Sequence, residues 1–283
     1  MKNYYKITPE GTKDLLFEEC TARNKVTHMI TSVFESKGYH QVITPGLEFF
    51  DAFTLKSGGI QQEDMYKLTD NKGRLLVLRP DSTLPIARMA AIRLQKEARP
   101  IRLYYNQPVY RNRPALTGHS NEINQAGIEL LGTAGLRADL EVIVTAIEAL
   151  QKIVPDFRIE IGHAGFFKAL ADQLPVDEAL REEIRLSIES KNYSSLNTIL
   201  DSLKQTDAVK AVRRLPRLFG GEEVFEEASA LFRGDLEQKA LSQLKALYRS
   251  LSHLCMGDKL IIDLGLVQRN DYYSDMIFSG YVE

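Results

Sequence analysis

The chain has 283 residues, of which 44% are hydrophobic and 26% are charged, and its formal net charge is −2 at pH 7. This length fits one large domain or two ordinary ones, and the hydrophobic share is sufficient for a packed core. The charge balance argues against a surface devoted mainly to nucleic acid, because phosphate binding needs a basic surplus. No apolar stretch has the length of a membrane span or a signal peptide. We therefore expect a cytoplasmic protein that does not associate with membranes.

The residues that usually hold metals and cofactors show no recognisable spacing. Cys20 and Cys255 lie far apart, and neither they nor the five histidines form a zinc pattern. Two reduced cysteines that pack inside the protein are the favoured interpretation. The sequence also contains no Walker loop, dinucleotide fingerprint or nucleophile elbow. We expect no metal and no cofactor.

Hydrophobic periodicity predicts a mixture of helices and strands over the first 165 residues. The predicted elements are a helix within residues 12–38, a strand over 41–49 with a break at Pro45, a hairpin over 65–81, a helix over 82–97, strands over 101–111 and 122–132, a helix over 136–153 and a strand over 157–163. Alternation in the strands over 101–111 and 122–132 predicts that they are antiparallel neighbours.

The character of the chain changes near Phe166. Residues 166–256 have a helical pattern almost throughout, with short breaks at prolines and glycines, whereas 257–283 returns to two strand-like runs around the sequence "QRND". We interpret 166–256 as a helical insertion into a core made of residues 1–165 and 257–283. The predicted fold class is α+β, an antiparallel sheet flanked by helices.

Polar residues gather where the predicted hairpin meets the following helix. Asp81 and Thr83 lie at this junction, in "VLRPDSTLPIAR". A carboxylate and a hydroxyl there could hold the ammonium group of a ligand. Alternatively, Asp81 or Ser82 only caps the helix and Thr83 is solvated. The stretch by itself favours the alternative, because caps are far commoner than binding sites.

Alternating residues of "EINQAGIELLG" form a second candidate site. Gln125, Gly127 and Glu129 fall on one face of the predicted strand, and the glycine would let a ligand approach the backbone between an amide and a carboxylate. Alternatively, this is the solvent face of an edge strand whose intervening residues face the core. The spacing leaves both interpretations open.

A third candidate follows the predicted turn near the C-terminal end, where Asp271, Tyr272 and Tyr273 are consecutive. A tyrosine hydroxyl beside a carboxylate suits recognition of a polar ring, but tyrosine pairs are also common in sheets.

Four stretches together resemble the histidyl-tRNA synthetases and their relatives, in the same order along the chain. They are "ITPEGTKDLL", "LRPDSTLPIAR", "PVYRNRPALTGHSNEINQAGIELLG" and "DLGLVQRNDYY". A fifth stretch, "TPGLEFFDAF", is similar to the dimerisation motif of class II synthetases. The resemblance covers nearly the whole chain and implies a class II synthetase core that forms a homodimer. It also implies that the chain stops within the sheet, so that the core is truncated at Glu283.

The resemblance extends to two groups of proteins, the synthetases and the regulatory subunits of ATP phosphoribosyltransferase. The residues at the nucleotide-site positions distinguish the two groups. The synthetase second motif opens F-R-x-E, whereas a cation replaces the glutamate here. Two loop arginines and the catalytic arginine of the synthetases are also replaced, the last by a neutral amide that cannot stabilise charge developing on phosphorus. The positions of this degenerate nucleotide site are Arg111, Arg113, His119, Asn121 and Gln268.

The positions that hold histidine in the synthetases keep suitable residues here. By resemblance, the ammonium group of histidine would be held by Asp81, Thr83 and Gln125, and its imidazole would face Glu129 and Tyr273, with Tyr272 beside them. An intact amino-acid half beside a dismantled nucleotide half is typical of a sensor that recognises histidine without activating it.

The leading hypothesis is therefore a non-catalytic regulatory subunit of ATP phosphoribosyltransferase. It would assemble with a short-form catalytic subunit, support the first step of histidine biosynthesis and transmit feedback inhibition by L-histidine; tRNA is not an expected partner. One alternative is an active histidyl-tRNA synthetase or a related adenylate-forming ligase. A second is a scaffold that has lost both functions.

Overall fold

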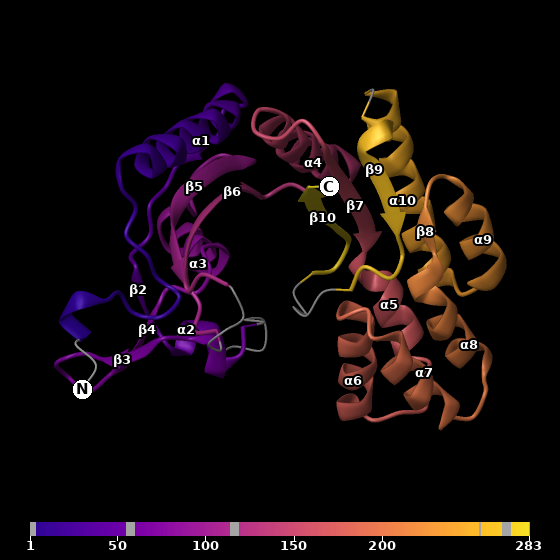
Figure 1. Cartoon of the computed structure of the whole chain (residues 1–283). Coiled ribbons are helices and arrows are strands. Elements are labelled where there is room, and N and C mark those ends of the chain that lie inside the picture. The colour runs from indigo at the N-terminus through magenta and orange to yellow at the C-terminus, as the bar shows by residue number, and fades with distance from the viewer. Residues whose placement is uncertain (1–3, 55–59, 114–118, 255, 268–272, 283) are drawn as a thin grey trace. The chain divides into compact units, whose positions relative to one another are not determined.

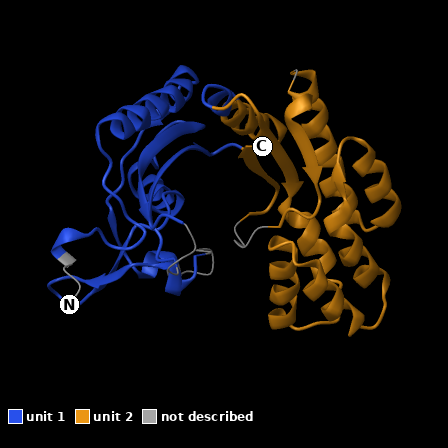
Figure 2. Ribbon diagram, in the orientation of Figure 1, with its two compact units in different colours: residues 1–133, 148–153 blue, residues 134–147, 154–283 orange. Residues whose placement is uncertain are grey.

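The computed structural model describes the whole chain except residues 1–3, 55–59, 114–118, 255, 268–272 and 283. Internal contacts divide the chain into two compact units, residues 1–133 with 148–153 and residues 134–147 with 154–283 (Figure 2). Both units combine helices with sheets, which confirms the predicted α+β class (Figure 1). None of the helices in the described part of the chain is long and apolar enough to cross a membrane.

The first unit contains most of the predicted elements of the N-terminal half. Its elements are η1 (Tyr4–Lys6), α1 (Phe17–Ser36), β1 (His40–Gln41), β2 (Leu47–Phe49), α2 (Asp51–Thr54), η2 (Gln62–Asp64), β3 (Lys67–Thr69), β4 (Leu75–Leu78), α3 (Thr83–Arg93), β5 (Ile101–Tyr110) and β6 (Glu122–Leu131). The helix α4 (Leu136–Gln151) contributes residues to both units.

The strand predicted over residues 41–49 is divided into β1 and β2 around Pro45. The guanidinium group of Arg79 explains the interruption, because its Nη1 donates to the backbone oxygens of Thr44, at 2.6 Å, and of Pro45, at 2.9 Å. These carbonyl groups therefore bind a buried side chain instead of a neighbouring strand.

A three-stranded sheet with the order β1-β5-β6 forms the centre of the first unit. β5 and β6 are antiparallel over ten residue pairs, as predicted, with Tyr105 opposite Gly127 and Leu103 opposite Glu129. Opposite residues of an antiparallel pair project to the same face of a sheet. Ile86 of α3 packs against Leu103 and Tyr105 on this face.

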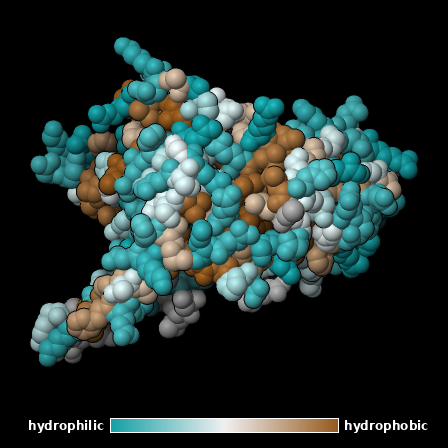
Figure 3. Space-filling view, turned by 90° about the horizontal axis from the view of Figure 1, so that it is seen from above, coloured by the Kyte–Doolittle hydropathy of each residue, from teal (hydrophilic) through white to brown (hydrophobic). Residues whose placement is uncertain are grey.

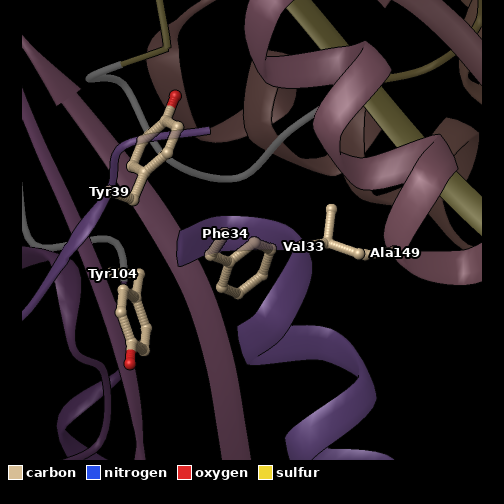
Figure 4. Close-up of a cluster of buried hydrophobic side chains, with 5 residues drawn as sticks. All are labelled: Val33, Phe34, Tyr39, Tyr104 and Ala149. Atoms are coloured by element: carbon tan, nitrogen blue, oxygen red, sulfur yellow. The ribbon is translucent and has the colours of Figure 1, made fainter. Parts of the chain in front are cut away.

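The other face of the same sheet is covered by α1. Val33 and Phe34 form a buried cluster with Tyr104, Tyr39 and Ala149 (Figure 4). The rings of Phe34 and Tyr104 lie 5.8 Å apart and are tilted by 53°. Helices thus cover both faces of the sheet at β5, so that side chains from either face of the strand are removed from water.

A second, antiparallel sheet with the order β2-β4-β3 lies in the same unit. Val77 is fully buried on one face, against Phe53 and Met65. The register places apolar side chains together on the opposite face, where Leu47, Phe49 and Leu68 are between 37% and 47% exposed. Hydrophobic residues also appear as separate patches among hydrophilic ones on the surface shown in Figure 3.

The second unit is built around a four-stranded sheet with the order β10-β7-β9-β8. Its elements after α4 are β7 (Phe157–His163), α5 (Ala164–Ala171), α6 (Glu178–Glu189), α7 (Tyr193–Asp201), α8 (Asp207–Arg214), η3 (Leu215–Arg217), β8 (Phe219–Gly220), α9 (Glu223–Leu231), α10 (Asp235–His253), η4 (Gly257–Lys259), β9 (Leu260–Asp263) and β10 (Met276–Val282).

Helices dominate residues 166–256, and the two-residue strand β8 is the exception to the predicted pattern. The rings of Phe166 and Phe232 meet edge to face with centroids 4.7 Å apart, and Ile159 and Ile161 of β7 are fully buried. The contact units group β7, β9 and β10 with these helices. The division into a core of 1–165 and 257–283 and an insertion of 166–256 stays a prediction.

The interpretation of both cysteines as packing residues is wrong for Cys20, which is exposed on α1. Its sulfur lies 3.2 Å from the backbone oxygen of Leu15, and it belongs to the first half of α1, where residues 17–26 are exposed. Cys255 lies outside the described residues.

Gly127→Ala tests the close pairing of β5 with β6. A Cβ atom at residue 127 would lie 2.5 Å from the Tyr105 hydroxyl oxygen, so the substitution should lower the free energy of unfolding by about 1–3 kcal/mol, as overpacking does. Gly46→Ala is the matched control, because nothing lies within 4 Å of its added Cβ. Equal urea midpoints for both variants would contradict this packing.

Candidate functional site

A hydrogen bond between two side chains joins α3 to the sheet of the first unit. The Thr83 hydroxyl, in the first turn of α3, donates to Oε1 of Glu129 on β6 at 2.8 Å. Leu103 lies opposite Glu129, and α3 packs on this face of the sheet. The acid is therefore held between a helix N-terminus and a strand.

Burial changes the proton affinity of this acid. The pKa of Glu129 is raised from 4.5 to about 7: desolvation raises it most, the hydrogen bond from Thr83 opposes this effect, and the nearby Asp81 carboxylate adds to it. Two carboxylates close together in a desolvated position attract a cation or a hydrogen-bond donor.

Asp81 both caps the helix and belongs to this group of acids. Its Oδ2 accepts a hydrogen bond from the backbone N–H of Thr83 at 2.9 Å, as the capping interpretation requires. The same interpretation is wrong for Thr83, whose hydroxyl is bonded to Glu129 and not to water alone. Capping and site formation therefore use the same short stretch.

Gln125 has a buried acceptor that the protein does not satisfy. Its Oε1 has no hydrogen-bond partner among the described residues, although it is removed from solvent. An unpaired buried amide oxygen costs free energy, commonly about 1–3 kcal/mol, and it needs an explanation in a native structure. We call Asp81, Thr83, Gln125 and Glu129 the Glu129 cluster.

The structure rejects the solvent-face interpretation of Gln125, Gly127 and Glu129. Ala126 and Ile128 do pack against the core on the opposite face, but Glu129 and the amide oxygen of Gln125 are desolvated. The space next to Gly127 is occupied by the Tyr105 hydroxyl, which lies 2.5 Å from where a Cβ would be. Sequence reasoning did not single out Tyr105, although the alternation of β5 would have placed it on this face.

A buried polar network fixes the start of α3. Nε2 of Gln107 donates to the hydroxyls of Ser82 and Thr44, each at 3.1 Å. Ser82 is fully buried, and Arg79 is 2% exposed with its guanidinium on backbone carbonyls. Arg79 is therefore satisfied by the fold, and the network holds the residues that follow it in place.

The degenerate nucleotide positions take different structural roles. Asn121 is 6% exposed, and its Nδ2 donates to the Tyr66 hydroxyl at 2.8 Å and to the backbone oxygen of Glu10. Nε of Arg111 donates to the Pro80 oxygen at 3.3 Å, and both Arg111 and Arg113 are half-buried. His119 is exposed. Asn121 thus connects the N-terminal segment around Glu10 to the start of β6.

The predicted site positions near the C-terminal end stay predictions. Gln268 and Tyr272 lie outside the described residues. Tyr273 belongs to the second unit and is 40% exposed. The described residues contain no group of three or more histidine, cysteine, aspartate or glutamate side chains that could hold a metal ion.

The Glu129 cluster is rich in acceptors and poor in donors. It combines two carboxylates with an unsatisfied amide oxygen, and the one hydroxyl proton of Thr83 is already used by Glu129. Such a site can bind a cationic group that donates several hydrogen bonds, such as an ammonium or imidazolium group. None of the four residues of the cluster supplies a cation for a phosphoryl group.

Comparisons with known proteins agree on one family. A family model described as Histidyl-tRNA synthetase matches residues 11–283. The ATP phosphoribosyltransferase regulatory subunit of Clostridium acetobutylicum is 42% identical to this chain, with 99% of the chain and 70% of the relative covered. The corresponding subunit of Bacillus mycoides is 39% identical, with 100% and 68% covered.

Solved structures extend the likeness to the fold. An ATP phosphoribosyltransferase regulatory subunit/histidyl-tRNA synthetase from Bacillus halodurans matches with a TM-score of 0.90 at 32% identity, covering 100% of this chain and 74% of that one. A histidyl-tRNA synthetase from Nostoc matches with a TM-score of 0.79 at 20% identity, covering 100% and 66%. These matches confirm the predicted class II synthetase-like fold.

Glu129→Gln tests the desolvation of this acid through pH. Because the folded-state pKa lies above the unfolded value, the folded state binds the extra proton between pH 4.5 and about 7, and stability falls as pH rises through this window. The full penalty applies above pH 7 and amounts to roughly 3 kcal/mol for a shift of this size.

The neutral amide removes that penalty, so Glu129→Gln should gain stability relative to the wild type between pH 5 and pH 8. Urea unfolding of both proteins at the two pH values measures the difference. A difference between variant and wild type that is the same at pH 5 and pH 8 would show that Glu129 is solvated.

Proposed function

The chain belongs to the histidyl-tRNA synthetase family, among its ATP phosphoribosyltransferase regulatory subunits, and we propose that it is the histidine-sensing component of that enzyme complex. Its role is regulatory and not catalytic. The sensing site is the Glu129 cluster, and its ligand is L-histidine.

The unsatisfied Oε1 of Gln125, on the same face of β6 as the desolvated carboxylate of Glu129, is the observation that carries this proposal. The ammonium group of histidine supplies three donors without an acceptor, which is what this cluster lacks. A bound cation also favours the ionised form of Glu129, so part of the cost of burying that carboxylate is offset when the ligand binds. Tyr272 and Tyr273 stay predictions for recognition of the imidazole, made from the resemblance alone.

The nucleotide side of the site lacks the charges needed to activate histidine. Asn121 serves the fold through Tyr66 and Glu10, and Arg113 places a cation where the synthetases use a carboxylate. By resemblance the catalytic position is Gln268, and its neutral amide cannot supply the positive charge that stabilises a phosphoryl transition state. Histidine binding without adenylation is the consequence.

The partner is the short-form catalytic subunit of ATP phosphoribosyltransferase, which performs the chemistry of the first step of histidine biosynthesis. Histidine transmits feedback inhibition only if it binds the inactive state of the complex more tightly than the active one. The apolar face of the β2-β4-β3 sheet, with Leu47, Phe49 and Leu68, provides the surface for homodimerisation through the synthetase-like core.

Glu129→Ala, assayed in the complex with the catalytic subunit, tests the sensing site. Loss of the carboxylate should raise the histidine concentration for half-inhibition by tenfold or more, equivalent to about 1.4 kcal/mol, while activity without histidine stays near the wild-type level. Glu122→Ala is the control, because Glu122 is exposed at the start of β6 and projects to the opposite face. Wild-type inhibition in Glu129→Ala would contradict the proposal.

A further inference from the structure

The second unit contains a cavity of about 260 Å³ whose lining includes no residue of the Glu129 cluster. It lies between α5, α10 and the residues before β10. His163, Lys168, Lys239, Gln243, Ser274 and Asp275 provide its polar lining, and Ala169 and Ala240 are among its apolar residues. We propose that this cavity binds a small organic anion, through a phosphate or carboxylate group held between Lys168 and Lys239.

The helix pair explains how the two lysines reach the same cavity. Gln173, just after α5, donates to Glu237 near the start of α10, whereas His163 before α5 contacts Gln243 one turn beyond Lys239. The two helices are therefore antiparallel. Residues three or four positions apart lie on one helix face, and Lys168 and Lys239 are each spaced in this way from other lining residues of their helix. Each helix therefore presents its lysine in the middle of the cavity.

The hydrogen bonds around His163 fix which groups can donate into the cavity. His163 is 6% exposed, and its Nδ1 accepts a hydrogen bond from the backbone N–H of Gly165 at 3.1 Å. Nδ1 is therefore unprotonated, and the neutral ring carries its proton on Nε2, which faces Oε1 of Gln243 at 3.3 Å. Burial lowers the pKa of His163 and favours this neutral form.

In this arrangement Oε1 of Gln243 accepts the hydrogen bond from His163, and its amide nitrogen can donate to a ligand. The Nε2 group of Gln243 can donate two hydrogen bonds and has no acceptor among the described residues. A Cβ at Gly165 would lie 3.0 Å from Cε1 of His163, so any larger residue there would require the ring to shift. An amide donor at one end of the cavity and two ammonium groups in its middle form a site that suits an anion.

The acidic residues of the cavity do not cancel the two lysines. Asp172 is paired with Arg181 at 2.7 Å. Asp275 accepts from the Ser274 hydroxyl at 3.2 Å, lies 3.8 Å from Nε2 of His163 and is 63% exposed, so water screens its charge. Asp139 does not line the cavity, and its pKa is raised by burial and by the charge of Asp275. Lys168 and Lys239 are exposed, and the described residues give neither of them an ion-pair partner.

Inorganic phosphate and acetate are the probes that test this site, each titrated into the full chain against sodium chloride at matched ionic strength. Amide NMR signals of Gly165, Gln243 and Ser274 should shift in a saturable manner with at least one of the two anions. The anion with the lower Kd identifies the acid group, phosphate or carboxylate, that the site prefers.

The double variant Lys168→Ala with Lys239→Ala should raise that Kd by tenfold or more. Lys204→Ala with Lys210→Ala is the matched control, because both of its lysines are exposed outside the cavity, and its Kd should equal that of the wild type. Gln243→Glu keeps the acceptor for His163 but replaces the amide donor with a negative charge, so it should also abolish saturation.

Either of two results overturns the proposal: shifts that match those in sodium chloride for both anions, or one affinity shared by the wild type and the Lys168/Lys239 variant. The proposal does not depend on histidine sensing, because none of these residues belongs to the Glu129 cluster.

Discussion

The desolvated position of Glu129 is the constraint on which the site depends. A carboxylate that lies under α3, near the second carboxylate of Asp81, is costly to the folded protein on its own, and so is the unsatisfied amide oxygen of Gln125 on the same strand face. The cost is lowered by one hydroxyl, that of Thr83, and by nothing positively charged within the cluster. A cationic ligand that binds next to Glu129 would offset part of this cost, so the arrangement favours binding of such a ligand.

The surrounding fold holds this arrangement in place with groups that take no part in binding. Arg79 donates to the carbonyl oxygens of Thr44 and Pro45 between β1 and β2. Gln107 links the Thr44 hydroxyl to the hydroxyl of Ser82 at the start of α3. Asn121, directly before β6, has a comparable role, because its amide donates to the backbone oxygen of Glu10 and to the Tyr66 hydroxyl. These hydrogen bonds give Asn121 a structural role, whatever ligand the neighbouring surface binds.

Much of the architecture could be predicted from the sequence, because strong periodicity identified α1, α3 and the pairing of β5 with β6. The site residues Asp81, Thr83 and Glu129 were identified by resemblance, and the structure brings them together. The solvation of each face of β6 could not be predicted, because it depends on where α3 packs and not on spacing along the strand. The Tyr105 hydroxyl beside Gly127 and the exposure of Cys20 were missed for the same reason: both follow from tertiary contacts.

The central claim is that recognition of histidine has been kept while its activation has been lost. Histidine-dependent ATP–pyrophosphate exchange measures activation directly, and calorimetric titration of L-histidine on the same sample shows whether the site is occupied. The account predicts saturable histidine binding with exchange no faster than in the absence of protein. Exchange that rises with histidine concentration would show that the nucleotide half of the site still works, and the regulatory account would be contradicted.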